Sequence, residues 1–172
     1  MRIRLPECRV TKPNSLKRYI GEASALFLVA VGMNYVWEIA EAPLYVGFES
    51  YTSVWLHCFI ASLGDGILVW LIFVVGWITF RRFDWYAHPN SRTLAVVFLT
   101  GLQIGIGIEW VAINMLGRWA YTVDMPLLPG LDVGLVPVLQ MLLLPPVIFR
   151  IVAWWAGKEC IYAEKHQGAR GQ

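Results

Sequence analysis

The chain has 172 residues, of which 58% are hydrophobic and only 15% are charged. Soluble domains carry considerably more charge, so this composition excludes an ordinary water-soluble fold and indicates a membrane protein. The formal net charge is only +2, and no loop combines a basic stripe with interleaved aromatic residues. A nucleic-acid partner is therefore not expected.

Four apolar stretches are long enough to cross a hydrocarbon core of about 30 Å, which takes roughly 20 helical residues. They cover residues 20–41, 55–80, 94–116 and 134–157. Runs of this length exclude a porin-like barrel, whose strands alternate over about ten residues. The sequence thus predicts one all-α domain over residues 1–172, folded as an integral membrane four-helix bundle.

The positive charges predict how the bundle is oriented. Lys and Arg residues lie in the two tails and in the loop between the second and third spans, whereas the other two loops together contain only Arg118. Loops rich in Lys and Arg stay in the cytoplasm. We therefore expect both termini to be cytoplasmic, the first and third loops to face outside, and the membrane to be a bacterial inner membrane.

The end of the first span carries polar residues in an otherwise apolar run. The segment N-Y-V-W-E-I-A-E places Asn34, Glu38 and Glu41 on one stripe of a helix. An ionisable group inside the bilayer costs on the order of 2.5–3.5 kcal/mol, so it normally faces the bundle interior and has a partner there. We expect this stripe to face the other helices.

The second and third spans also carry polar residues toward the predicted outer side. In the second span His57 lies near the outer end and Asp65 near the middle. In the third, Gly101, Gly105 and Glu109 recur at a spacing of four, which gives a small-residue face that ends at an acid. Such a face allows a neighbouring helix to approach closely.

The fourth span places Gln140 two turns from its start and then reads L-P-P-V. Pro145 and Pro146 lack a backbone N–H, so carbonyl groups near Met141 and Leu142 lose their helical partners. We expect the helix to bend there, and the freed carbonyls to need a donor from a neighbouring helix, a water molecule or a ligand.

All four spans thus bring polar groups to the outer half of the membrane, which predicts a polar pocket inside the bundle. Glu38 and Glu109 are the candidate acid catalysts, and Trp37 and Trp110, which adjoin them in sequence, are candidates for an aromatic wall. The full set of candidate ligand-binding residues is Asn34, Trp37, His57, Asp65, Trp110, Tyr121 and Gln140.

Three interpretations of these residues remain open. A carboxyl group in a low-dielectric pocket can act as a proton donor, which favours acid chemistry on a bound ligand. Glu38, His57 and Glu109 resemble a metal-ligand set, but the Glu-x-x-His pairs of di-iron bundles are absent, and no metal site is predicted. The third interpretation is structural, with buried acids that fix the helix register or an interface with another subunit.

Two short motifs resemble known membrane enzymes. N-Y-V-W-E, Asn34 to Glu38, is similar to the N-x-x-W-E segment of small integral-membrane terpene cyclases. R-W-A-Y, the following Pro-Gly turn and Pro137 resemble lycopene-cyclase-type membrane domains. The resemblance implies an isoprenoid ligand and Glu38 as proton donor. Those domains carry acids after the proline, whereas this chain reads Pro137, Val138, Leu139, Gln140.

The functional hypothesis is a small polytopic membrane protein whose pocket binds a membrane lipid or isoprenoid, with or without acid-catalysed chemistry on it. The alternative is a non-enzymatic accessory subunit whose polar faces dock onto other membrane subunits. The sequence identifies no cofactor.

Overall fold

The computed structural model describes residues 15–48 and 51–168, and within them four long helices form the fold. These helices are α1 (Ser15–Glu41), α2 (Tyr51–Phe80), α3 (Ser91–Trp110) and α4 (Leu135–Gly168). Four segments are long and apolar enough to span a membrane: Arg18–Leu44, Val54–Phe80, Ser91–Met115 and Leu135–Gly157. The prediction of an all-α bundle whose four long helices are apolar enough to cross a membrane is confirmed for this part of the chain.

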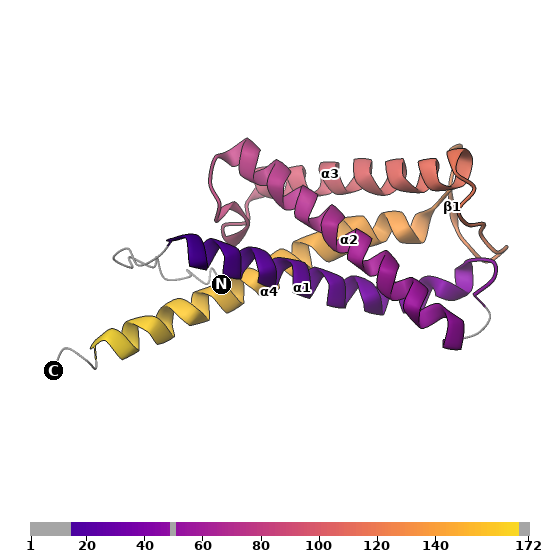
Figure 1. Cartoon of the computed structure of the whole chain (residues 1–172). Coiled ribbons are helices and arrows are strands. Elements are labelled where there is room, and N and C mark those ends of the chain that lie inside the picture. The colour runs from indigo at the N-terminus through magenta and orange to yellow at the C-terminus, as the bar shows by residue number, and fades with distance from the viewer. Residues whose placement is uncertain (1–14, 49–50, 169–172) are drawn as a thin grey trace.

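The helices run alternately up and down, so that α1 begins at the same end of the bundle as α4 ends (Figure 1). α1 packs against α2 and α4, and α3 packs against α4. α2 and α3 lie close together near the loop that joins them and diverge toward their other ends (Figure 1). The tail residues 1–14 and 169–172, on which part of the orientation prediction depends, lie outside the described residues.

The buried core occupies the half of the bundle that contains the α2–α3 loop. Trp85, in the short 3-10 helix η2 (Trp85–Ala87), packs there on Phe149 and donates its indole N–H to the Phe73 carbonyl at 3.2 Å. In the same half, Glu22 accepts hydrogen bonds from Arg18 and from the Tyr86 hydroxyl. Glu22 is buried, and these two hydrogen bonds stabilise its charge, as a charged group inside a bundle requires.

The loops at the opposite end of the bundle pair with each other. After α1 the chain forms the 3-10 helix η1 (Ala42–Leu44), and Tyr45 then forms an antiparallel bridge with Tyr121. Val46 N donates to Ala120 O at 2.9 Å. Beyond Tyr121, β1 (Leu127–Leu128) and β2 (Val133–Gly134) form a small hairpin that leads into α4. Residues 42–48, after α1, and the α3–α4 connection therefore form one cap over this end.

The C-terminal end of α3 continues into the π-helix η3 (Val111–Met115). A π-helix adds a residue to the turn and so changes the direction in which the following chain leaves the helix. Gly117 then adopts a φ of +55°, in the left-handed region that glycine occupies without strain. Together these features turn the chain back, so that Arg118 and Trp119 reach the interior side of the cap.

Candidate functional site

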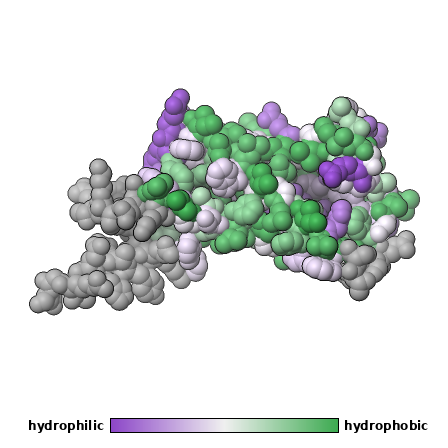
Figure 2. All heavy atoms as spheres, in the orientation of Figure 1, coloured by the Kyte–Doolittle hydropathy of each residue, from purple (hydrophilic) through white to green (hydrophobic). Residues whose placement is uncertain are grey.

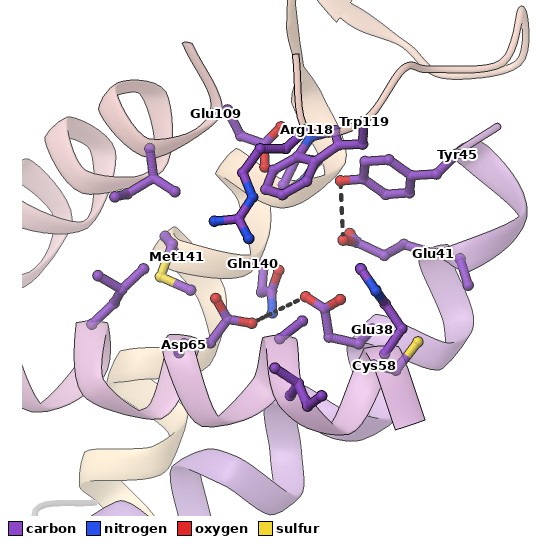
Figure 3. Close-up of a pocket in the computed structure, with 18 of the residues that line it drawn as sticks. Glu38, Glu41, Tyr45, Cys58, Asp65, Glu109, Arg118, Trp119, Gln140 and Met141 are labelled. Atoms are coloured by element: carbon purple, nitrogen blue, oxygen red, sulfur yellow. Dashed lines mark hydrogen bonds between the residues drawn. The ribbon is translucent and has the colours of Figure 1, made fainter. Parts of the chain in front are cut away.

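A cavity of about 480 Å³ lies under the cap, within the range of small-molecule pockets. Residues from all four helices line it, and several of their polar side chains converge on its centre (Figure 3). The carboxyl, imidazole, guanidinium and amide groups that line it are those of Glu38, Glu41, His57, Asp65, Glu109, Arg118 and Gln140. The divergence of α2 and α3 leaves room for this cavity in one half of the bundle, while the other half is filled by aromatic side chains.

The Gln140 amide is the hub of the polar network at the base of the cavity. Its Nε2 lies 3.0 Å from Asp65 Oδ2 and 3.4 Å from Glu38 Oε1 (Figure 3). The same nitrogen lies 2.8 Å from Asn34 Oδ1. Asn34 is completely buried and donates its own amide to the Ala30 carbonyl at 2.8 Å. A single side chain of α4 thus links polar groups of α1 and α2, which fixes the relative register of three helices.

Glu41 lies on the side of the cavity formed by the end of α1. The Trp37 indole donates to one of its carboxylate oxygens at 2.8 Å. The Tyr45 hydroxyl donates to the other at 3.3 Å (Figure 3). Trp37 is four residues before Glu41 on α1, so the helical repeat places its indole on the Glu41 face. Tyr45 lies beyond the end of α1, and the turn of η1 brings its hydroxyl back to Glu41. Both oxygens of this carboxylate accept hydrogen bonds from neutral donors.

Residues of the cap hold the Glu109 carboxylate in place through hydrogen bonds. The Tyr121 hydroxyl donates to Glu109 Oε2, the Trp119 indole donates to the same oxygen at 3.4 Å, and the backbone N–H of Gly134 donates to the Tyr121 oxygen at 2.8 Å. A Cβ at Gly134 would lie 2.9 Å from the Tyr121 ring. Glycine is needed there because it allows the tyrosine to reach Glu109.

The two cap tyrosines remain hydrogen-bond donors over a wide pH range. Burial, assisted by the nearby Glu41 and Glu109 carboxyl groups, raises the pKa of Tyr45. Burial and the hydrogen bond with Glu109 raise the pKa of Tyr121. A hydroxyl whose pKa is raised keeps its proton at and above neutral pH. Both phenols are therefore available to donate to the carboxyl groups beneath them.

Aromatic rings form the wall of the cavity nearest the cap. The Tyr45 ring makes edge contacts with Trp119 and Phe48, at centroid distances of 6.3 and 6.4 Å, and Phe48 lies 4.8 Å from His57. All four residues line the cavity. Arg118 extends from the cap into the space between Glu109 and Gln140 (Figure 3). Within the described part of the chain, no carboxylate lies at ion-pair distance from its guanidinium group.

The cavity opens sideways between α2 and α3. Ile60 of α2 and Ile108 of α3 both line it and are 61% and 47% exposed at the molecular surface. Figure 2 shows the corresponding hollow, with hydrophilic residues visible inside a largely hydrophobic face. Ile60 lies six residues into the candidate membrane span Val54–Phe80, which at about 1.5 Å per residue is about 9 Å from the end of the span. In a membrane that encloses this span, the opening lies at the depth of the lipid chains.

The structure brings together most of the residues that the sequence nominated. Glu38, His57, Asp65, Glu109 and Gln140 line the cavity. Asn34 and Tyr121 do not line it but hydrogen-bond to residues that do. Trp37 holds Glu41 and packs against the core, and Trp110 is exposed on the outside of α3. The rings that line the cavity come instead from the cap.

Most lining residues lay outside the predicted set, and they include Glu41, Tyr45, Phe48, Arg118, Trp119 and Met141. A sequence signal existed for Glu41, which shares the stripe of Glu38 three residues away. The only sequence signal for Arg118 was that the first and third loops together contain no other basic residue. Phe48, Arg118 and Trp119 lie in loops, where no periodicity indicates which way a side chain points.

No group of three or more His, Cys, Asp and Glu side chains in the described residues is arranged to hold a metal ion. No protein-family model, curated protein or solved structure matches the chain. The geometry of the cavity is therefore the basis for assigning a function.

Proposed function

We propose that this small polytopic membrane protein binds a membrane lipid or isoprenoid in the cavity beneath its cap. The ligand enters from the bilayer through the opening between α2 and α3. The observation that carries the proposal is the combination of a polar cavity with an exposed apolar rim, formed by Ile60 and Ile108, at the depth of the lipid chains. A water-soluble ligand would have to cross the apolar zone of the membrane to use that opening, whereas a lipid already lies beside it.

We further propose that Glu38 is the acid in any chemistry performed on the ligand. Glu41 and Glu109 each accept two hydrogen bonds from neutral donors, an arrangement that satisfies an ionised carboxylate. Among the described residues, the only N–H donor to Glu38 is the Gln140 amide, at 3.4 Å, and its other polar partner is the carboxyl group of Asp65. Two carboxyl groups can hydrogen-bond only if one of them carries a proton. Glu38 also lines the cavity. The resemblance of the Asn34–Glu38 segment to membrane terpene cyclases supports the same role.

Gly64→Leu is the direct test of the lipid pocket. Gly64 lines the cavity, and a Cβ built there meets no atom within 4 Å, so a leucine side chain would occupy ligand space without disturbing the packing. We expect the variant to fold normally and to lose most of the lipid that co-purifies with the wild-type chain, as measured by native mass spectrometry in mild detergent. In a parallel sample, Glu38→Gln should retain the ligand but change its chemical form if Glu38 donates a proton to it.

The matched control is Gly32→Leu, on α1. Gly32 also has no atom within 4 Å of a built Cβ, but it does not line the cavity, so this variant should keep its lipid. Equal lipid content in Gly64→Leu and the wild type would refute the pocket. Survival of the purified chain only together with another polypeptide would instead support the accessory-subunit alternative.

For the orientation, we propose that the cap faces outside and both termini face the cytoplasm. The basic residues Arg81, Arg82 and Arg92 lie at the end of the bundle opposite the cap (Figure 1). Val123, in the cap, is fully exposed. In a background whose other cysteines are replaced by serine, Val123→Cys should react with a membrane-impermeant maleimide in intact cells, whereas Arg92→Cys should react only after permeabilisation. The reverse pattern would invert the topology.

A further inference from the structure

The charges that line the cavity do not balance. Four carboxyl groups, those of Glu38, Glu41, Asp65 and Glu109, line the cavity together with the guanidinium group of Arg118, the only Lys or Arg among the lining residues. With Glu38 protonated, as its role as an acid requires, three carboxyl groups remain against one guanidinium group. That group makes no ion pair within the described residues. The indole and hydroxyl donors on Glu41 and Glu109 satisfy hydrogen bonds but add no positive charge. Negative charge in a low-dielectric site is costly unless a cation or bound protons offset it.

The wall of the cavity is also suited to a cation. Tyr45, Phe48 and Trp119 line it together. The Tyr45 ring makes edge contacts with Trp119, at a centroid distance of 6.3 Å, and with Phe48, at 6.4 Å. Aromatic faces attract positively charged groups, and the attraction is strongest for organic ammonium ions when water is excluded. The carboxyl groups and the rings belong to the same cavity, so one charged group can contact both. The apolar rim at Ile60 and Ile108 then provides an exit for a hydrocarbon chain.

We propose that the cavity selects an amphiphile with a positively charged organic ammonium head group, bound between the carboxyl groups and the aromatic wall. Its chain leaves between α2 and α3. This inference rests on the proposed lipid pocket and specifies the chemistry of the ligand. Arg118 weakens binding of the head group, because its guanidinium group partly offsets the negative charge of the cavity.

The first test compares two probes of the same chain length on the unmodified protein. Dodecyltrimethylammonium and dodecyldimethylamine N-oxide have heads of similar size, but at mildly alkaline pH only the first carries a net positive charge. Binding is measured by equilibrium dialysis against nanodiscs that hold the full chain, after subtraction of empty nanodiscs. We expect the ammonium probe to bind at least about tenfold more tightly, which corresponds to about 1.4 kcal/mol.

Substitutions in the lining should change this preference in opposite directions. Asp65→Asn removes a negative charge at nearly constant shape and should weaken binding of the ammonium probe. Arg118→Gln removes the positive charge and should strengthen it. Neither should change binding of the N-oxide by a comparable factor. Asp124→Asn is the matched control, because Asp124 is an exposed acid of the same cap that does not line the cavity.

Equal affinity for the two probes would overturn the inference and leave the lipid pocket intact, since the pocket is tested separately by Gly64→Leu. An effect of Asp124→Asn as large as that of Asp65→Asn would also overturn it, because the attraction would then come from the general surface charge. Absence of saturable binding for both probes would overturn it as well.

Discussion

Gly101→Ala is expected to destabilise the bundle and to disturb the cavity with a single added methyl group. A Cβ at Gly101 would lie 2.3 Å from the carbonyl oxygen of Met141 on α4. This oxygen belongs to the backbone, so α3 and α4 would have to separate as a whole. Pro145 has no N–H to pair with the Met141 carbonyl four residues earlier, and α3 can approach that oxygen closely only because Gly101 lacks a side chain. Overpacking of this kind costs about 1–3 kcal/mol.

Tryptophan fluorescence monitors the unfolding of the purified chain in mild detergent. Gly107→Ala is the control on the same helix, since a Cβ at Gly107 meets no atom within 4 Å and alanine favours a helix over glycine. It should leave the free energy of unfolding unchanged or raise it. Gly101→Ala should also reduce lipid occupancy, because Met141 and Gln140 line the cavity on the α4 side. Similar stability of the two variants would show that the close helix contact does not exist.

Gln140→Leu is expected to destabilise the chain by about 1–3 kcal/mol, the usual cost of leaving a buried polar group without its partner. Gln140 is 2% exposed, and its amide is the donor to Asn34 Oδ1. Asn34 is 0% exposed, so water cannot replace that donor. The same substitution removes the 3.0 Å contact between Gln140 Nε2 and Asp65 Oδ2. Asp65 lines the cavity, however, so water in the cavity can solvate its carboxylate.

A double-mutant cycle with Asn34→Leu separates this effect from lost packing. When both partners of a buried hydrogen bond become apolar, no group is left unsatisfied, so the double variant should be less destabilised than the sum of the single variants. Gln103→Leu, at an exposed position of α3, serves as the control for the substitution itself and should be close to neutral. An additive cycle, or equal effects of Gln140→Leu and Gln103→Leu, would contradict the role of Gln140 as the hub.

The helical architecture followed from the sequence because the need to cross the membrane constrains a chain so strongly. About 20 consecutive apolar residues must form a helix, since no water is present to pair with an extended backbone. The inward direction of the Asn34–Glu38–Glu41 stripe followed for a related reason, the cost of exposing an acid to lipid. Glu38, Asp65, Glu109 and Gln140 could therefore be nominated as site residues before their contacts were known.

The aromatic part of the site was harder to predict. Trp37 and Trp110 were chosen as the aromatic wall because they adjoin Glu38 and Glu109 in sequence. Residues adjacent on a helix point about 100° apart, so a tryptophan beside an inward-facing acid turns away from the acid's direction. Trp110 is accordingly exposed. Trp119 and Tyr45 reach the cavity through the turn at Gly117 and the bridge between the two loops, which depend on tertiary contacts.

The sequence by itself determined the number of helices, their approximate limits and the polar face of each, because hydrophobicity and helical periodicity are local properties read along one chain. Only the tertiary structure decided that α2 and α3 diverge, that the cavity opens sideways between them, and that Arg118, Trp119 and Tyr45 complete its lining. These features arise from packing between segments far apart in sequence, such as Gly101 against Met141 and Tyr45 beside Tyr121. The distance between such segments is fixed by side-chain volume in the assembled bundle, which no local pattern encodes.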